Sequence, residues 1–557
     1  MRAIVKSAIG VALFQLGLVN LLAQLPNCPV RQAPGTLVEN PPSVRSQNGL
    51  LQVDLALRNG VDQYGFMHYC YDYPADATSG FIEAPTLRLN PGDHLELNLA
   101  NRITADSSPA TDAMSDMGPM PGIPGTDCTG GTIIDTDTNL HFHGLNVPPV
   151  CHQDDVLSTV IHTGDPPFRY AIQIPANEPP GLYWYHPHAH GYTTTQVEGG
   201  AAGALIVNGI EKYFPELASL QERVLILRQQ FYNQNSWIPG PFQYTLNFQT
   251  SSPGLFPLPL IQMTPGKREF WRFLNACTQC FVTLQVQYSG VAQPLTLISR
   301  DGVPFSQPEI TNTIFVPPAG RAEFIVPGPQ AGISGQFVTA GVNTGYLGNP
   351  NPATPIANII TSSSDHVAAS PVASPDLPSV PQRFAGLENA VPTAKRKLYF
   401  SEFTVNPTTV KFFITVDGQK PTTFYANEPP AIVTHVGAVE DWTVENRAEE
   451  MHAFHIHQLH FLVLAVNGKP LAQPILRDTI ALQAWTGAGP YPNVTLRMDF
   501  RDPETAGMFV YHCHILDHED AGMMAKILVK PSDDSQASGA AAGRAALREK
   551  RSRPAGE

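Results

Sequence analysis

Residues 86–99 read TLRLNPGDHLELNL, in which two short runs of alternating apolar and polar side chains flank the turn Pro91-Gly92-Asp93. Alternation with a period of two is typical of a β-strand with one buried face. Pro, Gly and Asp are residues that favour tight turns. The stretch therefore predicts two strands joined by a turn.

The same strand–turn–strand unit recurs twice further along the chain. Residues 263–274 read MTPGKREFWRFL, and residues 434–444 read THVGAVEDWTV, a less close match. Three copies of one unit predict three related β-sandwich domains, which we place at 45–210, 211–360 and 396–531. The Ser-, Pro- and Ala-rich segment 361–395 is expected to be a linker. Residues 532–557 have almost no large apolar side chains and are expected to be disordered.

Length and composition favour the same fold class. A chain of 557 residues corresponds to three or four domains at about 150 residues each. With 44 glycines, 53 prolines and only 15 % charged residues, long helices and coiled coils are not expected. The hydrophobic content of 43 % argues against disorder, and the net charge of −14 does not indicate a nucleic-acid partner. We therefore expect an all-β globular protein.

The N-terminus predicts export from the cytoplasm. Arg2 and Lys6 are followed by a mostly apolar stretch at 8–23, which is short for a bilayer span of about 20 residues. We expect residues 1–23 to be a signal peptide, with an uncleaved anchor as the alternative. The mature protein is expected to be secreted or periplasmic, with no membrane association after cleavage.

Seven cysteines are present, an odd number. In an oxidising compartment, six of them can form up to three disulfides, and the sequence leaves their connectivity open. These six are Cys28, Cys70, Cys128, Cys151, Cys277 and Cys280. Cys277 and Cys280 form a single C-x-x-C without a second pair, so we expect a structural disulfide or two buried thiols.

Twelve of the 18 histidines fall into four short windows. The windows are HFHG at 141–144, HPHAH at 186–190, HAFHIHQLH at 452–460 and HCHILDH at 512–518. In an extended backbone, residues i and i+2 lie on one face, so each His-x-His directs two imidazoles toward one site. Four such pairs predict a metal centre, because imidazole is a ligand for copper, zinc, iron and nickel.

The last window indicates copper. Cys513 lies between His512 and His514, so its thiolate points to the opposite face of the strand and serves a second site. With His452, His518 and Met523, it completes one thiolate, two imidazoles and a thioether. This set is typical of blue-copper electron-transfer sites, whereas structural zinc has little use for Met. An electron arriving at Cys513 can then pass through the backbone to the neighbouring imidazoles.

These motifs and their order resemble those of the three-domain multicopper oxidases, a family that includes laccases, bilirubin oxidases and cuprous oxidases. The resemblance spans about 50–530 and includes WRFLN at 271–275 and SRDG at 299–302. It implies three consecutive cupredoxin-like Greek-key β-sandwiches and four copper ions. It also implies one-electron oxidation of a substrate coupled to the four-electron reduction of O₂ to water.

The resemblance also implies a ligand set. A type 1 copper would be held by His452, Cys513 and His518, with Met523 axial. A type 2 copper would be held by His141 and His455. A pair of type 3 coppers would be held by His143, His186, His188, His457, His512 and His514.

Oxygen reduction consumes protons, so acidic groups are expected near the cluster. Glu519 stands where family members keep a proton-delivering carboxylate. A second acid is usually found near the first motif, where we choose Asp154, with Asp155 as the alternative.

Some residues depart from the family pattern or exceed the ligand count. Ala453 and Gln458 stand where the family often has Pro and Gly, without removing a ligand. The surplus histidines are expected to be neighbours of the ligands or surface residues: His152, His190 and His460. Met114, Met117 and Met120 could bind Cu(I), but we expect them to fill gaps in a loop.

We therefore expect a laccase-like oxidase of phenolic or other aromatic reductants. The alternative within the same class is a metallo-oxidase of Cu(I), Mn(II) or Fe(II). The alternative from another class is a periplasmic copper-sequestering protein, which we disfavour because storage does not need the Cys513 bridge between two sites.

Overall fold

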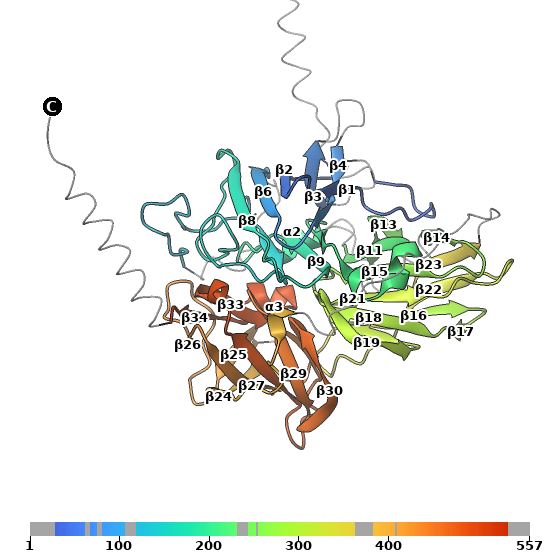
Figure 1. The fold of residues 1–557 in the computed structure, drawn as a ribbon. Coiled ribbons are helices and arrows are strands. Elements are labelled where there is room, and N and C mark those ends of the chain that lie inside the picture. Colours follow the sequence, from blue (N-terminus) through green and yellow to red (C-terminus); the bar gives the residue numbers. More distant parts are fainter. Residues whose placement is uncertain are drawn as a thin grey trace, which may run out of the picture.

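The computed structural model describes residues 28–29, 31–61, 67–74, 81–105, 118–230, 243–251, 254, 256–361, 382–406 and 409–532. These residues form three β-sandwiches that meet at a common junction (Figure 1). The predicted signal peptide, Met114, Met117 and residues 533–557 of the predicted tail lie outside the described residues.

The first sandwich packs two five-stranded sheets over a core of leucine, valine and tyrosine side chains. One sheet contains, in spatial order, β1 (Ser43–Arg45), β5 (Thr86–Leu89), β10 (Gly203–Val207), β9 (Gly181–His186) and β7 (His141–His143). The other contains β4 (Phe81–Glu83), β3 (Met67–Pro74), β2 (Leu50–Val61), β6 (His94–Arg102) and β8 (Phe168–Gln173).

The second sandwich has a seven-stranded and a six-stranded sheet. The larger contains β13 (Gln249–Ser251), β12 (Tyr244–Leu246), β11 (Gln221–Gln229), β15 (Glu269–Asn275), β21 (Arg321–Val326), β18 (Leu295–Arg300) and β19 (Val303–Thr311). The smaller contains β14 (Leu260–Met263), β23 (Thr354–Thr361), β22 (Gly335–Ala340), β16 (Val282–Tyr288) and β17 (Val291–Ala292), with β20 (Ile314–Val316) paired to β16.

The third sandwich has a six-stranded and a five-stranded sheet. The larger contains β25 (Thr409–Val416), β24 (Ala394–Asn406), β27 (Ala438–Asn446), β32 (Asn493–Phe500), β29 (Phe461–Val466) and β30 (Lys469–Arg477). The smaller contains β26 (Ile432–His435), β34 (Met524–Lys530), β33 (Gly507–Cys513), β28 (His452–Ile456) and β31 (Thr479–Leu482).

Helices in the described residues are short. They are α2 (Thr193–Glu198), α3 (Leu516–Asp520) and the 3₁₀ turns η2 (Ile210–Lys212), η3 (Pro215–Ser219), η4 (Gln382–Phe384) and η5 (Pro503–Thr505). Among the described helices, none has the length and apolar character needed to cross a bilayer. The expectation of an all-β fold is confirmed.

The repeated strand–turn–strand unit has the same structural role three times. It corresponds to β5–β6, β14–β15 and β26–β27, and in each case the two strands belong to different sheets of one sandwich. The second strand of each unit then pairs in parallel with an earlier strand, β2, β11 or β24. The turn found in the sequence is therefore a crossing between the two sheets.

Apolar clusters join the sandwiches to one another. Trp184 and Leu182 on β9 pack against Val224 and Ile226 on β11 of the second sandwich. The last part of the expected linker also packs, because Phe384 contributes to a buried cluster with residues of the second and third sandwiches. Residues 362–381 of that linker lie outside the described part of the chain.

The structure pairs the six cysteines whose connectivity the sequence leaves open. The disulfides are Cys28–Cys70, Cys128–Cys151 and Cys277–Cys280. Cys513 is a free, buried thiol. The C-x-x-C is thus a disulfide within the second sandwich.

Candidate metal centre

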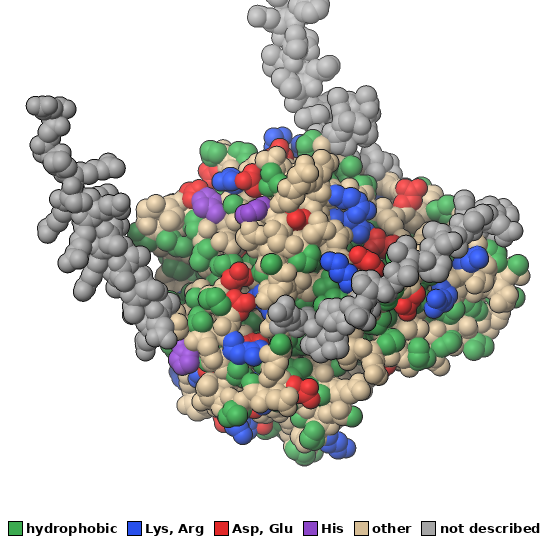
Figure 2. Space-filling model, viewed as in Figure 1, with side chains coloured by type: hydrophobic (Ala, Val, Ile, Leu, Met, Phe, Trp, Pro, Cys, Tyr) green, Lys and Arg blue, Asp and Glu red, His purple; other side chains and the backbone are tan. Residues whose placement is uncertain are grey.

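The four histidine windows meet between the first and third sandwiches. The first two lie on β7 and at the end of β9, and the last two on β28 and at the end of β33. Strand pairing aligns His141 with His186 and His455 with His512. Few histidines are visible on the face in Figure 2, because those of the four windows are buried.

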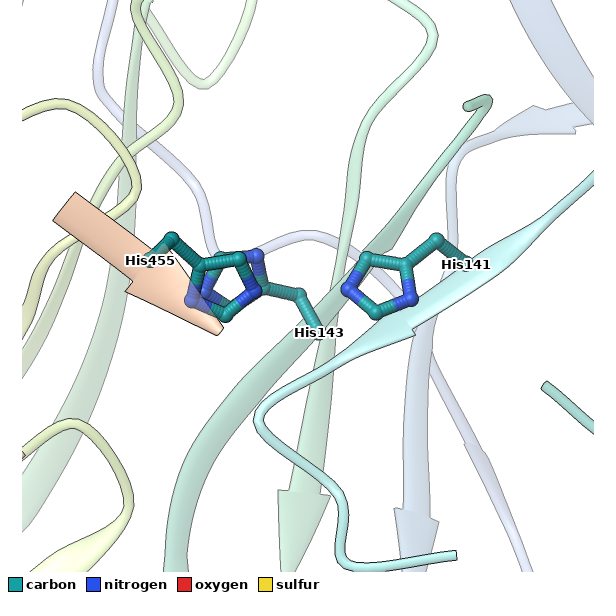
Figure 3. A group of neighbouring side chains, drawn as sticks. All are labelled: His141, His143 and His455. Atoms are coloured by element: carbon teal, nitrogen blue, oxygen red, sulfur yellow. The ribbon is translucent and has the colours of Figure 1, made fainter. Parts of the chain in front are cut away.

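Imidazole rings from the two sandwiches pack directly on one another. The His143 ring stacks on that of His455 with centroids 3.9 Å apart, while His141 lies beside them (Figure 3). The His141 ring stacks in the same way on His457, at 3.8 Å. The junction of the two sandwiches is therefore built from ligand-type side chains.

Eight histidines form three groups, two of which share His143, and within each group the candidate ligand atoms lie within 4.8 Å of one another. The groups are His141, His143 and His455; His143, His186 and His514; and His188, His457 and His512. This spacing is suited to several adjacent metal ions that share one enclosed site.

The hydrogen bonds leave metal-binding atoms free. The Nδ1 of His186 donates to the Pro187 carbonyl and that of His455 to the Asp478 carbonyl, both at 2.8 Å. Their Nε2 atoms, and that of His141, are buried without a hydrogen-bond partner. A buried polar atom without a partner is costly, whereas a neutral imidazole with its other nitrogen bonded is a preformed metal ligand.

Burial keeps these rings neutral. Burial, reinforced by neighbouring imidazoles, lowers the pKa of six rings well below its ordinary value: His143, His186, His188, His455, His457 and His514. Burial also lowers the pKa of His512 to about 3. A neutral imidazole retains the lone pair that a metal requires.

A second group surrounds Cys513 on the opposite face of β33. The Cys513 Sγ lies 3.5 Å from His452 Nδ1 and 3.9 Å from His518 Nδ1, and the two Nδ1 atoms are 3.3 Å apart. Burial raises the pKa of this thiol well above its ordinary value. A metal reverses that preference, since a coordinating thiol is deprotonated.

Met523 lies close to this group in the fold. The Cys513 N–H donates to the Met523 carbonyl over 3.1 Å, and both side chains belong to one apolar cluster. The Ile515 N–H points at the Cys513 sulfur over 3.5 Å. Two imidazoles and one thiol converge in a buried pocket, and the adjoining methionine belongs to the same apolar cluster as Cys513.

Family models described as multicopper oxidase match residues 132–212, 217–359 and 392–533, well over half of the chain. The chain belongs to the multicopper oxidase family. The histidine clusters fit copper sites, and the protein is an oxidoreductase whose oxidant is O₂.

Relatives of this multicopper oxidase include proteins named multicopper oxidase, laccase and iron transport multicopper oxidase. A multicopper oxidase of Staphylococcus aureus is 22 % identical over 465 residues, covering 81 % of this chain and 83 % of the relative. A laccase of Bacillus subtilis is 24 % identical, covering 70 % and 78 %. An iron transport multicopper oxidase of Epichloe festucae is 22 % identical, covering 83 % and 74 %.

Solved structures share the fold. A multicopper oxidase variant from Aquifex aeolicus has a TM-score of 0.64 at 18 % identity, over 89 % of this chain and 100 % of its own. A multicopper oxidase from Campylobacter jejuni, described as a metallo-oxidase, has a TM-score of 0.61 at 22 % identity, over 91 % and 97 %. The three sandwiches are therefore cupredoxin domains, as the sequence resemblance implied.

The structure places both proposed acids of the oxidase against histidines. The Glu519 carboxylate is fully buried, 3.2 Å from His512 Nδ1 and 3.5 Å from His188 Nδ1. Burial raises its pKa well above the ordinary value. Asp154 accepts from His141 Nδ1 at 3.0 Å, whereas Asp155 accepts from the backbone N–H groups of residues 157 and 158. Asp154 is thus the acid next to a histidine of the cluster.

Asp478 and Arg321 are functional neighbours that the sequence did not reveal. The Asp478 carboxylate lies 3.4 Å from His143 Nε2, and its carbonyl accepts from His455. Arg321, on β21 of the second sandwich, donates to both Asp478 carboxylate oxygens over 2.8 and 2.5 Å. These partners are 157 residues apart, so no local motif marks them.

The three histidines and the methionine that exceed the ligand count lie at different places in the fold. His190 is buried with its ring centroid 5.1 Å from that of His188, and His460 donates to the Asp301 carbonyl over 2.7 Å. His152 is partly exposed and pairs with Asp127. Met120 is buried in an apolar cluster between the first and third sandwiches.

Proposed function

We propose that this multicopper oxidase is laccase-like and oxidises phenolic or other aromatic substrates by one electron at a type 1 copper. His452, Cys513 and His518 would hold that copper, with Met523 as a further ligand. The observation that carries the proposal is the position of Cys513 between His512 and His514: its sulfur groups with His452 and His518, whereas the two neighbouring rings belong to two other histidine groups.

The three histidine groups support three copper ions, which with the type 1 copper make four in total. His141 and His455 would hold the type 2 copper. The groups His143, His186 and His514, and His188, His457 and His512, would each hold one type 3 copper. Bound copper supplies the one-electron redox chemistry that protein side chains lack.

The chain itself provides the electron path. Cys513 is bonded through the backbone to both neighbouring histidines, so the two groups are joined covalently within three residues. A copper-sequestering protein would need no such connection. The arrangement therefore favours turnover over storage.

The chain also provides acidic groups beside the cluster. Glu519 lies beside His188 and His512, and Asp154 beside His141, at two sides of the histidine cluster. The raised pKa of the Glu519 carboxyl favours its protonated form, which is the form that can give a proton to reduced oxygen.

Replacing Glu519 by Gln tests this role. We expect turnover to fall about 10²-fold or more, because a positioned general acid contributes about 10²–10⁴-fold. The blue absorption should remain, since Cys513 and its imidazoles are untouched. Asp517→Asn is the matched control on the same helix, because the Asp517 carboxylate accepts from Gln279. Equal turnover of wild type and Glu519→Gln across the pH range would contradict the role.

Aromatic side chains of the β24–β25 hairpin and of one loop of the second sandwich support an aromatic reductant. The Phe412 ring stacks on that of His518 with centroids 4.1 Å apart. On the same hairpin Phe403 is 63 % exposed, and Tyr346, in a loop of the second sandwich, is 87 % exposed. That loop is joined to the type 1 region because the Leu347 N–H donates to the Glu449 carbonyl.

A metal-ion reductant is the second candidate, favoured by two carboxylates. Glu402 lies 3.1 Å from His452 Nε2 and Glu450 lies 3.0 Å from His518 Nε2. Burial raises the pKa of both, that of Glu450 to about 7. Carboxylates are suitable ligands for Mn(II) and other hard cations.

Oxygen consumption by the copper-loaded protein separates the two candidates. We expect a phenol to be oxidised faster than Cu(I), Mn(II) or Fe(II), and Glu450→Gln to leave phenol oxidation nearly unchanged. If a metal ion is instead the faster reductant, and Glu450→Gln lowers its oxidation by about 10–100-fold, the metallo-oxidase is supported. Copper binding without oxygen consumption with any reductant would support sequestration.

We also propose a secreted or periplasmic location. Three disulfides support it, because disulfides persist in oxidising compartments. The apolar N-terminal segment 8–23 supports it independently.

A further inference from the structure

Gln458 has an unusual backbone conformation next to the histidine cluster. It directly follows His457, in the turn after β28, and its φ is +61°. Residues other than glycine are uncommon in this left-handed region. The left-handed backbone at a glutamine therefore calls for a reason in its side chain.

The side chain crosses from the third sandwich to the first. Gln458 is 3 % exposed, and its Nε2 donates to Asp154 Oδ2 over 2.5 Å. A carboxylate accepts hydrogen bonds, so the amide NH₂ group faces it. The same nitrogen also lies 3.4 Å from the Asp154 carbonyl oxygen.

This contact completes the set of donors around the Asp154 carboxylate. Oδ1 accepts from the Phe142 N–H over 2.9 Å, and both oxygens lie 3.0 Å from His141 Nδ1. Without Gln458, His141 is the remaining hydrogen-bond partner of Oδ2 among the described residues. Gln458 therefore fixes the rotation of the carboxylate that orients the His141 ring.

His457, the residue before Gln458, also contacts the His141 ring. His457 stacks on His141 with centroids 3.8 Å apart, so two consecutive residues of the third sandwich contact the His141–Asp154 pair of the first. A strained backbone conformation persists where the surrounding structure requires it. Glycine would relieve the strain but could not make this hydrogen bond.

We propose that Gln458 is a positioning residue for the type 2 copper ligand His141, acting through Asp154. This inference rests on the proposed function, in which His141 and His455 hold the type 2 copper. Gln458 keeps the Asp154 carboxylate in the orientation in which it accepts the His141 Nδ1 proton, so that Nε2 faces the cluster.

Two variants separate the side chain from the backbone. Gln458→Leu keeps a side chain of similar volume and the left-handed backbone but removes the donor, whereas Gln458→Gly removes the donor and the strain. We expect both to weaken type 2 copper binding by about tenfold, measured by copper content after titration with a chelator. The type 2 electron paramagnetic resonance signal should change in both, while the blue absorption remains.

Gln279→Leu is the matched control, because Gln279 also donates its amide to a carboxylate across a domain boundary, that of Asp517, over 2.8 Å. Its type 2 signal should match the wild type. A wild-type signal and copper affinity in Gln458→Leu, or a change in Gln458→Gly alone, would overturn the inference. Absence of a type 2 signal from the copper-loaded wild type would instead refute the proposed function.

Discussion

Cys513→Ser is expected to abolish the blue absorption and reduce oxygen consumption with any reductant to background. The thiolate is the group that gives a type 1 copper its colour and its short route to the cluster. Serine keeps the backbone of β33, so the imidazoles of His512 and His514 should remain in place on the opposite face. We therefore expect the protein to retain the three coppers of the cluster.

Three measurements check this result: copper content, the visible spectrum and oxygen consumption. The control is the double variant Cys28→Ser with Cys70→Ser, which removes sulfur from the first sandwich and should remain blue. Oxygen turnover at the wild-type rate by Cys513→Ser would show that electrons do not pass through this residue.

Arg321→Met is expected to destabilise the protein by about 3–5 kcal/mol, because it leaves a buried carboxylate without its counter-charge. Both Arg321 and Asp478 are 0 % exposed. Burial alone would raise the pKa of Asp478, but the Arg321 guanidinium holds it well below its ordinary value. The Asp478 carboxylate is therefore charged. Without Arg321, the folded protein would contain a buried charge with no counter-charge to offset the free-energy cost of its desolvation.

The Arg321→Met substitution should also weaken copper binding at the histidine cluster. Asp478 lies beside His143 and accepts from His455, so its displacement should lower copper content as well as the thermal transition. The double variant Arg321→Met with Asp478→Asn removes both charges and should recover much of the stability. A thermal transition equal to the wild type in Arg321→Met would mean that the ion pair contributes little.

Local sequence patterns were sufficient for the class of fold and for the histidine groups. Period-two alternation around 86–99 identifies strands because the pleat itself has that period. His-x-His identifies ligand pairs for the same reason, and β7 and β33 place them as expected. Strands and His-x-His pairs can be recognised because they depend only on residues that are close together in the sequence.

Contacts between distant parts of the chain could not be predicted in this way. The Arg321–Asp478 ion pair, the cysteine pairing and the Gln458–Asp154 hydrogen bond each join segments that only the tertiary fold brings together. Gln458 was visible in the sequence as a departure from the family pattern, but its partner lies 304 residues away. The second sandwich has no histidine, yet it supplies the arginine behind Asp478.

The division of ligands between the first and third sandwiches has a consequence for how the protein is made. Half of the histidines around the cluster lie at 141–188 and the other half at 455–514, near the end of the chain. During synthesis, the early half remains an incomplete site until residues 455–514 have left the ribosome. Metal binding then adds its free energy to the docking of the two sandwiches. Bound copper is therefore expected to stabilise the contact between the first and third sandwiches.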